Sequence, residues 1–201
     1  MLGRENFITS TFRSFPDSIK LISFLFLLVH PSNNNLYAFL LFVASTLSNF
    51  LLKKIFMVIY KLIGKKKLPI LGLGGRPEGA SSCSTFLTFD DKLSKSFGMP
   101  SGHSQIAWVF ASYYIFEIWN PLDYKNDKAD NDMKFYDNYK EKHAVIVKTL
   151  QTALLSTFAL FMSYSRVYIE KCHTLEQVTM GAIFGVAVGF LAYYLKPYIL
   201  K

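Results

Sequence analysis

The sequence predicts an all-α fold, a polytopic membrane helix bundle of four to five spans that forms a single domain over residues 1–201. Hydrophobic residues make up 51% of the 201 residues, and charged residues make up only 18%, below the roughly 25% usual in soluble domains. This composition excludes a disordered chain and a coiled coil. The apolar residues also come in separate blocks, and a membrane helix needs about 20 such residues.

Four blocks are candidates for membrane spans, and each carries at most one charged residue. They cover Leu36–Leu52, Ile106–Trp119, Ala144–Tyr164 and Val178–Leu195. The helix of the second block could begin near Ser101. The last block carries Gly181, Gly185 and Gly189 on one helix face. Such a face of small residues lets helices approach closely in lipid, so it predicts packing and not chemistry.

A fifth block, Leu21–Val29, is shorter and lies between Pro16 and Pro31 in the N-terminal segment, residues 1–35. Its length also suits the apolar region of a signal peptide, with basic residues such as Arg13 before it. The segment that follows has no small-residue cleavage site. We therefore expect a short retained helix here, in preference to an interfacial segment. The catalytic helix bundle is expected to lie in residues 36–201.

The chain is basic, with a net charge of +8. Such a balance is compatible with nucleic acid, anionic lipid or a phosphorylated substrate. Nucleic acid is disfavoured, because apolar spans separate the basic residues. The two cysteines, Cys83 and Cys172, provide neither a disulfide framework nor the spacing of metal ligands. The expected partners are therefore the bilayer and a lipid substrate, with no cofactor and no required protein partner.

Three polar segments hold the residues suited to chemistry. They contain Arg76 in a long loop, the Pro-Ser-Gly-His run at residues 100–103, and Arg166 followed by His173. Counting crossings brings all three to one membrane face. The loop with Arg76 runs directly into the second segment, and the span that begins at Ala144 returns the chain to the same side.

Arginine and histidine at one interface suit a phosphoryl group, since guanidinium forks pair with phosphate oxygens. The helix that opens at Ser101 offers free N–H groups and a positive dipole end to an anion, and Gly102 permits close backbone approach. One neutral imidazole can attack phosphorus, while a second, protonated imidazole donates to the leaving oxygen. No carboxylate cluster at this face suits a divalent metal, so a metal-free mechanism is predicted.

These segments resemble the three signatures of the type-2 phosphatidic acid phosphatase superfamily. The run Phe97–Gln105, and Ser165–Tyr168 followed by His173 and Gln177, are similar to the dolichyldiphosphatase branch. The resemblance extends from about Asn49 to Gly181. It is specific in the second signature with its flanks and weak in the first signature alone.

The resemblance implies a role for each matching residue. His173 would be the nucleophile that forms a phosphohistidine, and His103 would be the general acid. Four residues would hold the phosphoryl oxygens: Arg76, Ser101, Gly102 and Arg166. The branch implies an enzyme of the endoplasmic reticulum membrane whose site faces the lumen and removes phosphate from dolichyl diphosphate, which recycles the carrier of N-glycosylation. The loops on the two sides of the membrane carry nearly equal numbers of Lys and Arg residues, so their charges do not indicate which side of the membrane the site faces.

The sequence departs from the family pattern at three points, of which two concern spacing. The family has a lysine seven positions before the arginine of its Arg-Pro pair, where this chain has Pro69. Lys53 and Lys67 are both candidates to replace it. Six residues, where the family has five, separate Arg166 from His173. The additional residue must be absorbed by a bulge or a loop.

The third departure is Gln177, which stands where the broad superfamily has an aspartate. His173 and Gln177 share one helix face, so the glutamine carbonyl can accept the Nδ1 proton and fix the ring tautomer. It cannot stabilise an imidazolium with a full charge. This favours a substrate whose leaving group is a phosphate and not a more basic alkoxide. Glu176 is an alternative orienting residue.

Two other functions compete with a lipid diphosphate phosphatase. The first is a phosphatase of phosphatidate or another lipid monophosphate. The second is a catalytically inactive membrane scaffold of the same fold, which the displaced lysine and the additional residue before His173 would explain.

Overall fold

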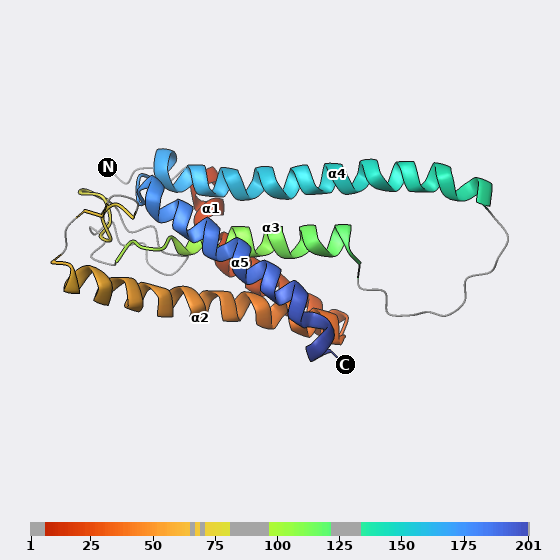
Figure 1. Cartoon of the computed structure of the whole chain (residues 1–201), viewed down its shortest axis with the longest axis horizontal. Coiled ribbons are helices and arrows are strands. Elements are labelled where there is room, and N and C mark those ends of the chain that lie inside the picture. The colour runs from red at the N-terminus through yellow and green to blue at the C-terminus, as the bar shows by residue number, and fades with distance from the viewer. Residues whose placement is uncertain (1–6, 65–66, 69–70, 81–96, 122–133, 201) are drawn as a thin grey trace.

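The computed structural model describes residues 7–64, 67–68, 71–80, 97–121 and 134–200. Within these ranges the structure is helical and has no β-strands, which confirms the predicted class (Figure 1). Its α-helices are α1 (Phe7–Val29), α2 (Asn33–Leu62), α3 (Gly102–Trp119), α4 (Lys134–Tyr164) and α5 (Leu175–Ile199). A π-helical turn, η1 (Ser165–Ile169), continues α4.

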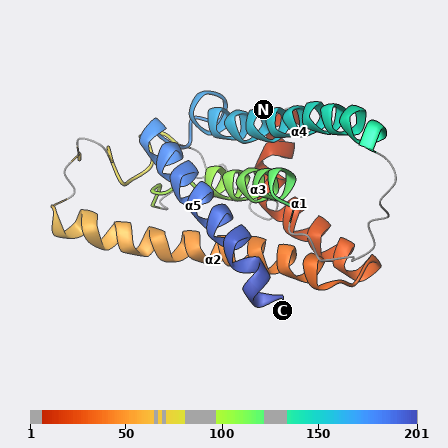
Figure 2. The ribbon, with the colours of Figure 1, turned by 45° about the vertical axis from the view of Figure 1, so that its right-hand side comes forward.

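In the described part of the chain, α2, α5 and the segment Ala144–Ile169 are long and apolar enough to cross a membrane. The central helix, α3, packs against each of the other four α-helices, and Figure 2 shows it between them. Because its neighbours shield it from lipid, α3 can carry polar residues such as the buried Gln105. Its charged Glu117 pairs with Lys196 of α5 at 2.6 Å. At about 1.5 Å per residue, α3 is roughly 27 Å long, close to the thickness of a bilayer core.

Each α-helix extends beyond the apolar block that predicted it, and α1 and α4 show why. The first was expected to begin after Pro16, but α1 runs through this proline. A proline removes one intrahelical hydrogen bond, and packing compensates, because Phe15 of α1 meets Phe110 of α3 edge to face. The fourth helix begins at Lys134, ahead of the predicted Ala144. Lys and Glu are good helix formers, so the helix extends beyond its apolar part.

The glycine face of α5 lies against α3, as predicted. A Cβ atom at Gly181 would lie 2.5 Å from the backbone oxygen of Ser101, and one at Gly185 would lie 2.5 Å from that of Gln105. These contacts advance in the same direction along both helices, so α3 and α5 are parallel and begin at the same end of the bundle. Close packing of the two backbones therefore fixes the relative positions of the segments that precede them.

The chain order brings several segments to that end of the bundle. In Figure 1, α2 and α4 end where α3 and α5 begin, and the described loop residues 71–80 lie beside them. This arrangement agrees with the crossing count made from the sequence.

Candidate active site

His103 and His173 lie close together at the shared end of α3 and α5. His103 is in the first turn of α3, and His173 directly precedes Thr174, the N-cap of α5. The backbone N–H of Ser101 donates to the carbonyl of Gln177 at 3.0 Å, which joins the two helix starts. The two rings interact electrostatically, so they belong to one site.

Gln177 fixes the orientation of the His173 ring. Its Nε2 donates to the backbone oxygens of Leu73 at 3.0 Å and Gly75 at 2.6 Å. Only the NH₂ group can face two carbonyls, so Oε1 is the atom that lies 2.9 Å from His173 Nδ1. Nδ1 must then carry the proton and donate it to Oε1. The lone pair on Nε2 is consequently available for attack on phosphorus.

The same contacts explain why a glutamine suits this position. The two carbonyls belong to the turn directly before Arg76, so the Gln177 amide ties the Arg76 loop to the His173 ring. A carboxylate in its place would face these carbonyl oxygens with no proton to donate. Gly98 provides the room, because a Cβ atom there would lie 2.5 Å from Gln177 Oε1. Glu176, the alternative orienting residue, packs against the Arg76 loop instead.

The charge state of His173 should be unusual. Burial, and then the positive charge of Arg76, lower the pKa of His173 to about 3. We therefore expect the ring to stay neutral in substrate-free protein between about pH 8 and about pH 5, where an ordinary histidine with a pKa of about 6.5 gains a proton. In Gln177→Glu, a carboxylate beside the ring favours the imidazolium, so the pKa of His173 should rise.

Nitrogen-15 NMR of the labelled histidines checks this expectation. Wild-type His173 should keep the Nδ1–H tautomer throughout this pH range, while the ring in Gln177→Glu should gain a proton as the pH falls. A wild-type His173 that titrates as an ordinary histidine would contradict the described burial.

An anion-binding arrangement surrounds the two rings. Ser101 is the N-cap of α3, but its hydroxyl makes no capping hydrogen bond. Its buried Oγ also has no hydrogen-bond partner among the described residues. Arg166 is fully buried, and its charge interacts with those of Arg76 and His103. With Gly102 at the positive end of the α3 dipole, these groups suit the oxygens of a phosphoryl group.

The structure separates the two lysines that the sequence left as candidates. Lys53, in the C-terminal third of α2, interacts electrostatically with Arg76 and with both catalytic candidates, His103 and His173. Lys67 is exposed, and its charge acts on Glu176. Lys53 is therefore the lysine that lies with the other site residues.

A π-helical turn absorbs the additional residue between Arg166 and His173. The Glu170 N–H donates to the carbonyl of Ser165 at 2.8 Å, five residues back, and such a turn holds more residues than an α-helical one. Lys171 then adopts a left-handed conformation with φ of 51°. The chain folds back so that the His173 N–H donates to the carbonyl of Arg166 at 3.2 Å.

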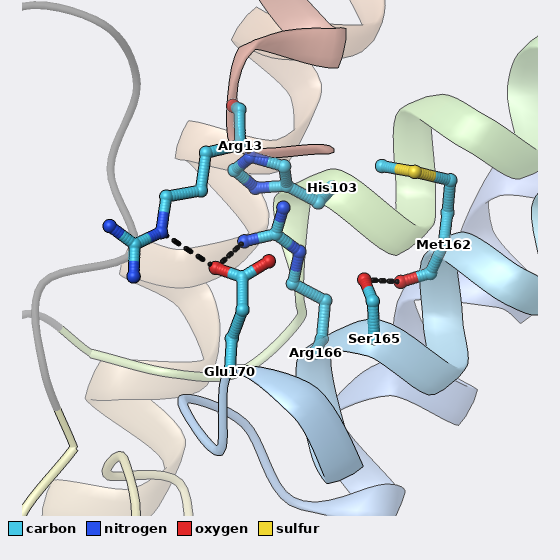
Figure 3. A network of polar contacts seen from close by, with 6 residues as sticks. All are labelled: Arg13, His103, Met162, Ser165, Arg166 and Glu170. Carbon is cyan, nitrogen blue, oxygen red and sulfur yellow. Dashed lines mark hydrogen bonds and ion pairs between the residues drawn. The ribbon is translucent and has the colours of Figure 1, made fainter. Parts of the chain in front are cut away.

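Two charged residues that were not selected from the sequence join the site. Glu170 Oε2 accepts hydrogen bonds from Arg166 Nη1 at 2.9 Å and from Arg13 Nε at 3.0 Å (Figure 3). His103 Nε2 donates to the backbone oxygen of Arg13 at 2.9 Å. The four-residue spacing of Arg166 and Glu170 was a usable signal for the first pair. Nothing in the sequence indicates the contacts of Arg13.

Two buried amides support the start of α3 and were also not selected. Asn49 Nδ2 donates to Gln105 Oε1 at 2.8 Å and to the carbonyl of Pro100 at 3.4 Å. A Cβ atom at Gly102 would lie 2.9 Å from Asn49 Oδ1, so this glycine allows the amide to approach the helix start. Asn49 therefore links α2 to the segment that carries Ser101.

Two observations at this site concern metal-ion binding and thiol chemistry. In the described residues no three His, Cys, Asp or Glu side chains are grouped so that they could hold a metal ion. Cys172 is disulfide-bonded and so offers no thiolate beside His173, while Cys83 lies outside the described residues.

Comparison with known proteins places this site in a family. The family model described as "PAP2 superfamily" matches residues 23–201. The chain belongs to the PAP2 superfamily. The PAP2 match includes every predicted site residue, from Lys53 to Gln177, and leaves out the first part of α1 with Arg13.

Several curated PAP2 relatives carry the name dolichyldiphosphatase 1. That of Homo sapiens is 32% identical over 96 residues, which cover 48% of this chain and 34% of the relative. That of Dictyostelium discoideum is 29% identical over 107 residues, which cover 53% of this chain and 39% of the relative. The matched region is thus a little over a third of the length of these relatives.

A solved structure shares the PAP2 fold. The crystal structure of a transmembrane PAP2-type phosphatidylglycerolphosphate phosphatase from Bacillus subtilis aligns with a TM-score of 0.55 and 18% identity. The alignment covers 98% of this chain and 81% of that one. At this identity the likeness extends to the fold alone.

Proposed function

We propose that this PAP2 superfamily protein is an integral membrane phosphatase that hydrolyses dolichyl or another polyprenyl diphosphate to the monophosphate and phosphate. The observation that carries the proposal is the His173 ring, held with its proton on Nδ1 by Gln177 and placed beside His103. The similarity to dolichyldiphosphatase 1 supports a diphosphate as the substrate.

In the proposed mechanism, His173 Nε2 attacks the terminal phosphorus of the lipid diphosphate. The bond from that phosphorus to the bridging oxygen breaks, and the lipid monophosphate leaves as a phosphohistidine forms. With its Nε2–H bonded to the Arg13 carbonyl, His103 gains a second proton on Nδ1 when the negatively charged diphosphate is bound beside it, and this Nδ1 proton passes to the leaving oxygen. The same ring then takes a proton from the water that attacks the phosphohistidine. This second step releases phosphate and restores neutral His173.

The other proposed roles concern the phosphoryl oxygens. Guanidinium groups and the ammonium of Lys53 neutralise the charge of the terminal phosphate, and the Ser101 hydroxyl and the first N–H groups of α3 donate hydrogen bonds to it. The residues in these roles are Lys53, Arg76, Ser101, Gly102 and Arg166. No step requires a metal ion.

Gln177 supports a diphosphate over a monophosphate ester. It leaves His173 without the full charge of a carboxylate, a change that costs about 10⁴ in kcat in a Ser-His-Asp triad. A lipid monophosphate, with a second pKa of about 6, departs more easily than an alkoxide, which compensates in part. A phosphatase of phosphatidate would not have this compensation.

The proposed location is the endoplasmic reticulum membrane, with the site facing the lumen, where the enzyme would recycle the lipid carrier of N-glycosylation. The disulfide at Cys172 supports this orientation, because disulfides persist in oxidising compartments and Cys172 adjoins His173.

A substrate panel tests the proposal on purified protein in detergent. We expect phosphate release from dolichyl diphosphate at least about tenfold faster than from phosphatidate. The activity should survive EDTA and be inhibited by vanadate, and a His173→Asn preparation should correct for contaminating phosphatases. Faster release from phosphatidate would instead identify a lipid monophosphate phosphatase. Lipid binding without turnover on any substrate would identify an inactive scaffold.

A further inference from the structure

The π-helical turn places a buried carboxylate next to the arginine that would bind phosphate. The Glu170 side chain is 1% exposed and the Arg166 side chain 0%, and their atoms Oε2 and Nη1 are 2.9 Å apart. A carboxylate here repels an incoming phosphoryl group and cancels much of the attraction of Arg166 for it. A further positive charge beside Glu170 would therefore strengthen anion binding at Arg166.

Arg13 of α1 is placed to do this. Its Nε donates to the same Oε2 atom at 3.0 Å, and its side chain is 23% exposed. Figure 3 shows the Arg13 and Arg166 side chains on opposite sides of the Glu170 carboxylate, with the His103 ring near Arg166. The charges of Arg13, Arg166 and Glu170 sum to one positive charge, whereas those of Arg166 and Glu170 alone would sum to zero.

Arg13 has a second link to the site through its backbone. Its carbonyl accepts from His103 Nε2 at 2.9 Å, which leaves Nδ1 as the ring atom that can face a leaving group. This contact therefore ties α1 to the proposed general acid.

We propose that Arg13 is a positioning residue of the phosphoryl site, which acts on Arg166 through Glu170 and on His103 through its own carbonyl. The proposal rests on the functions proposed above for Arg166 and His103. Glu170 holds the Arg166 guanidinium in one geometry, and Arg13 keeps Glu170 from cancelling its charge. The N-terminal helix, which the PAP2 match covers only from residue 23 on, thereby becomes part of the site.

A double-mutant cycle separates this role from a general effect on folding. The full chain is compared with Arg13→Gln, Glu170→Gln and the double variant, and orthovanadate affinity is the main readout. Arg13→Gln should weaken vanadate binding by about tenfold, because Glu170 then neutralises Arg166. In the Glu170→Gln background the same change should alter affinity by less than about twofold, since the coupling runs through Glu170.

Two further variants serve as controls. Arg13→Lys keeps the charge and should recover part of the affinity that Arg13→Gln loses. Lys20→Gln removes a charge from the same helix, where Lys20 pairs with Asp17 at 2.7 Å, and should leave vanadate affinity unchanged. Thermal unfolding midpoints in detergent identify any variant whose loss comes from misfolding.

Three results would overturn the role of Arg13: unchanged vanadate affinity in Arg13→Gln, an equal loss with and without Glu170, or the same loss in Lys20→Gln. Vanadate binding does not require lipid turnover. A protein that binds vanadate but hydrolyses no lipid diphosphate would therefore refute the proposed substrate, and the cycle would still decide the role of Arg13. A wild-type protein that binds no vanadate would refute both.

Discussion

Replacing His173 with asparagine is expected to reduce hydrolysis of the lipid diphosphate by at least about 10³-fold, because the variant has no imidazole to accept the phosphoryl group. The asparagine side chain would keep an N–H group that can donate to the side-chain oxygen Oε1 of Gln177. The helix start and the Arg76 loop should therefore stay in place. Phosphate release under single-turnover conditions measures the loss.

The matched control for this variant is His30→Asn. His30 is exposed and lies between α1 and α2, at the end of the bundle opposite to the site. The control should keep full turnover and the same unfolding midpoint. Undiminished hydrolysis by His173→Asn would refute the assigned nucleophile.

Replacing His103 with asparagine should have an effect that depends on the leaving group. On a lipid monophosphate such as phosphatidate, loss of a general acid should lower any turnover by about 10²- to 10⁴-fold, since a basic alkoxide needs the proton. On a lipid diphosphate the loss should be smaller, because the leaving monophosphate has a second pKa of about 6. The ratio of kcat values for wild type and variant on the two substrates measures this difference.

The vanadate affinity of His103→Asn shows whether its anion site is intact. Affinity close to that of wild type, together with unequal kcat losses, would identify His103 as the proton donor. Equal losses on the two substrates would contradict that role.

Much of the fold follows from hydropathy, because lipid-facing helices must be apolar along their length. This holds for the apolar parts of α2, α4 and α5. It fails for α1, where Pro16 looked like a boundary but the packing of Phe15 on Phe110 keeps the helix continuous. The block Ile106–Trp119 also predicted α3, whose polar first turn, with residues such as Gln105, is shielded from lipid by the neighbouring helices.

The site was predictable where chemistry depends on short spacing along the chain. The expected contact of His173 with Gln177 is present, but His173 lies just before the N-cap of α5 and does not share a helix face with Gln177. Contacts between distant segments leave no such pattern. The choice of Lys53 over Lys67 depends on how the chain after α2 folds back, and Arg13 meets Glu170 across 157 positions.

Trapping the covalent intermediate decides whether His173 receives the phosphoryl group. The protein is mixed with lipid diphosphate carrying a labelled terminal phosphate, quenched in alkali within one turnover and digested for mass spectrometry. We expect an acid-labile, alkali-stable phosphoryl group on His173 that is absent from His173→Asn. Label on a different residue, or turnover with no labelled protein at any time, would contradict the proposed mechanism.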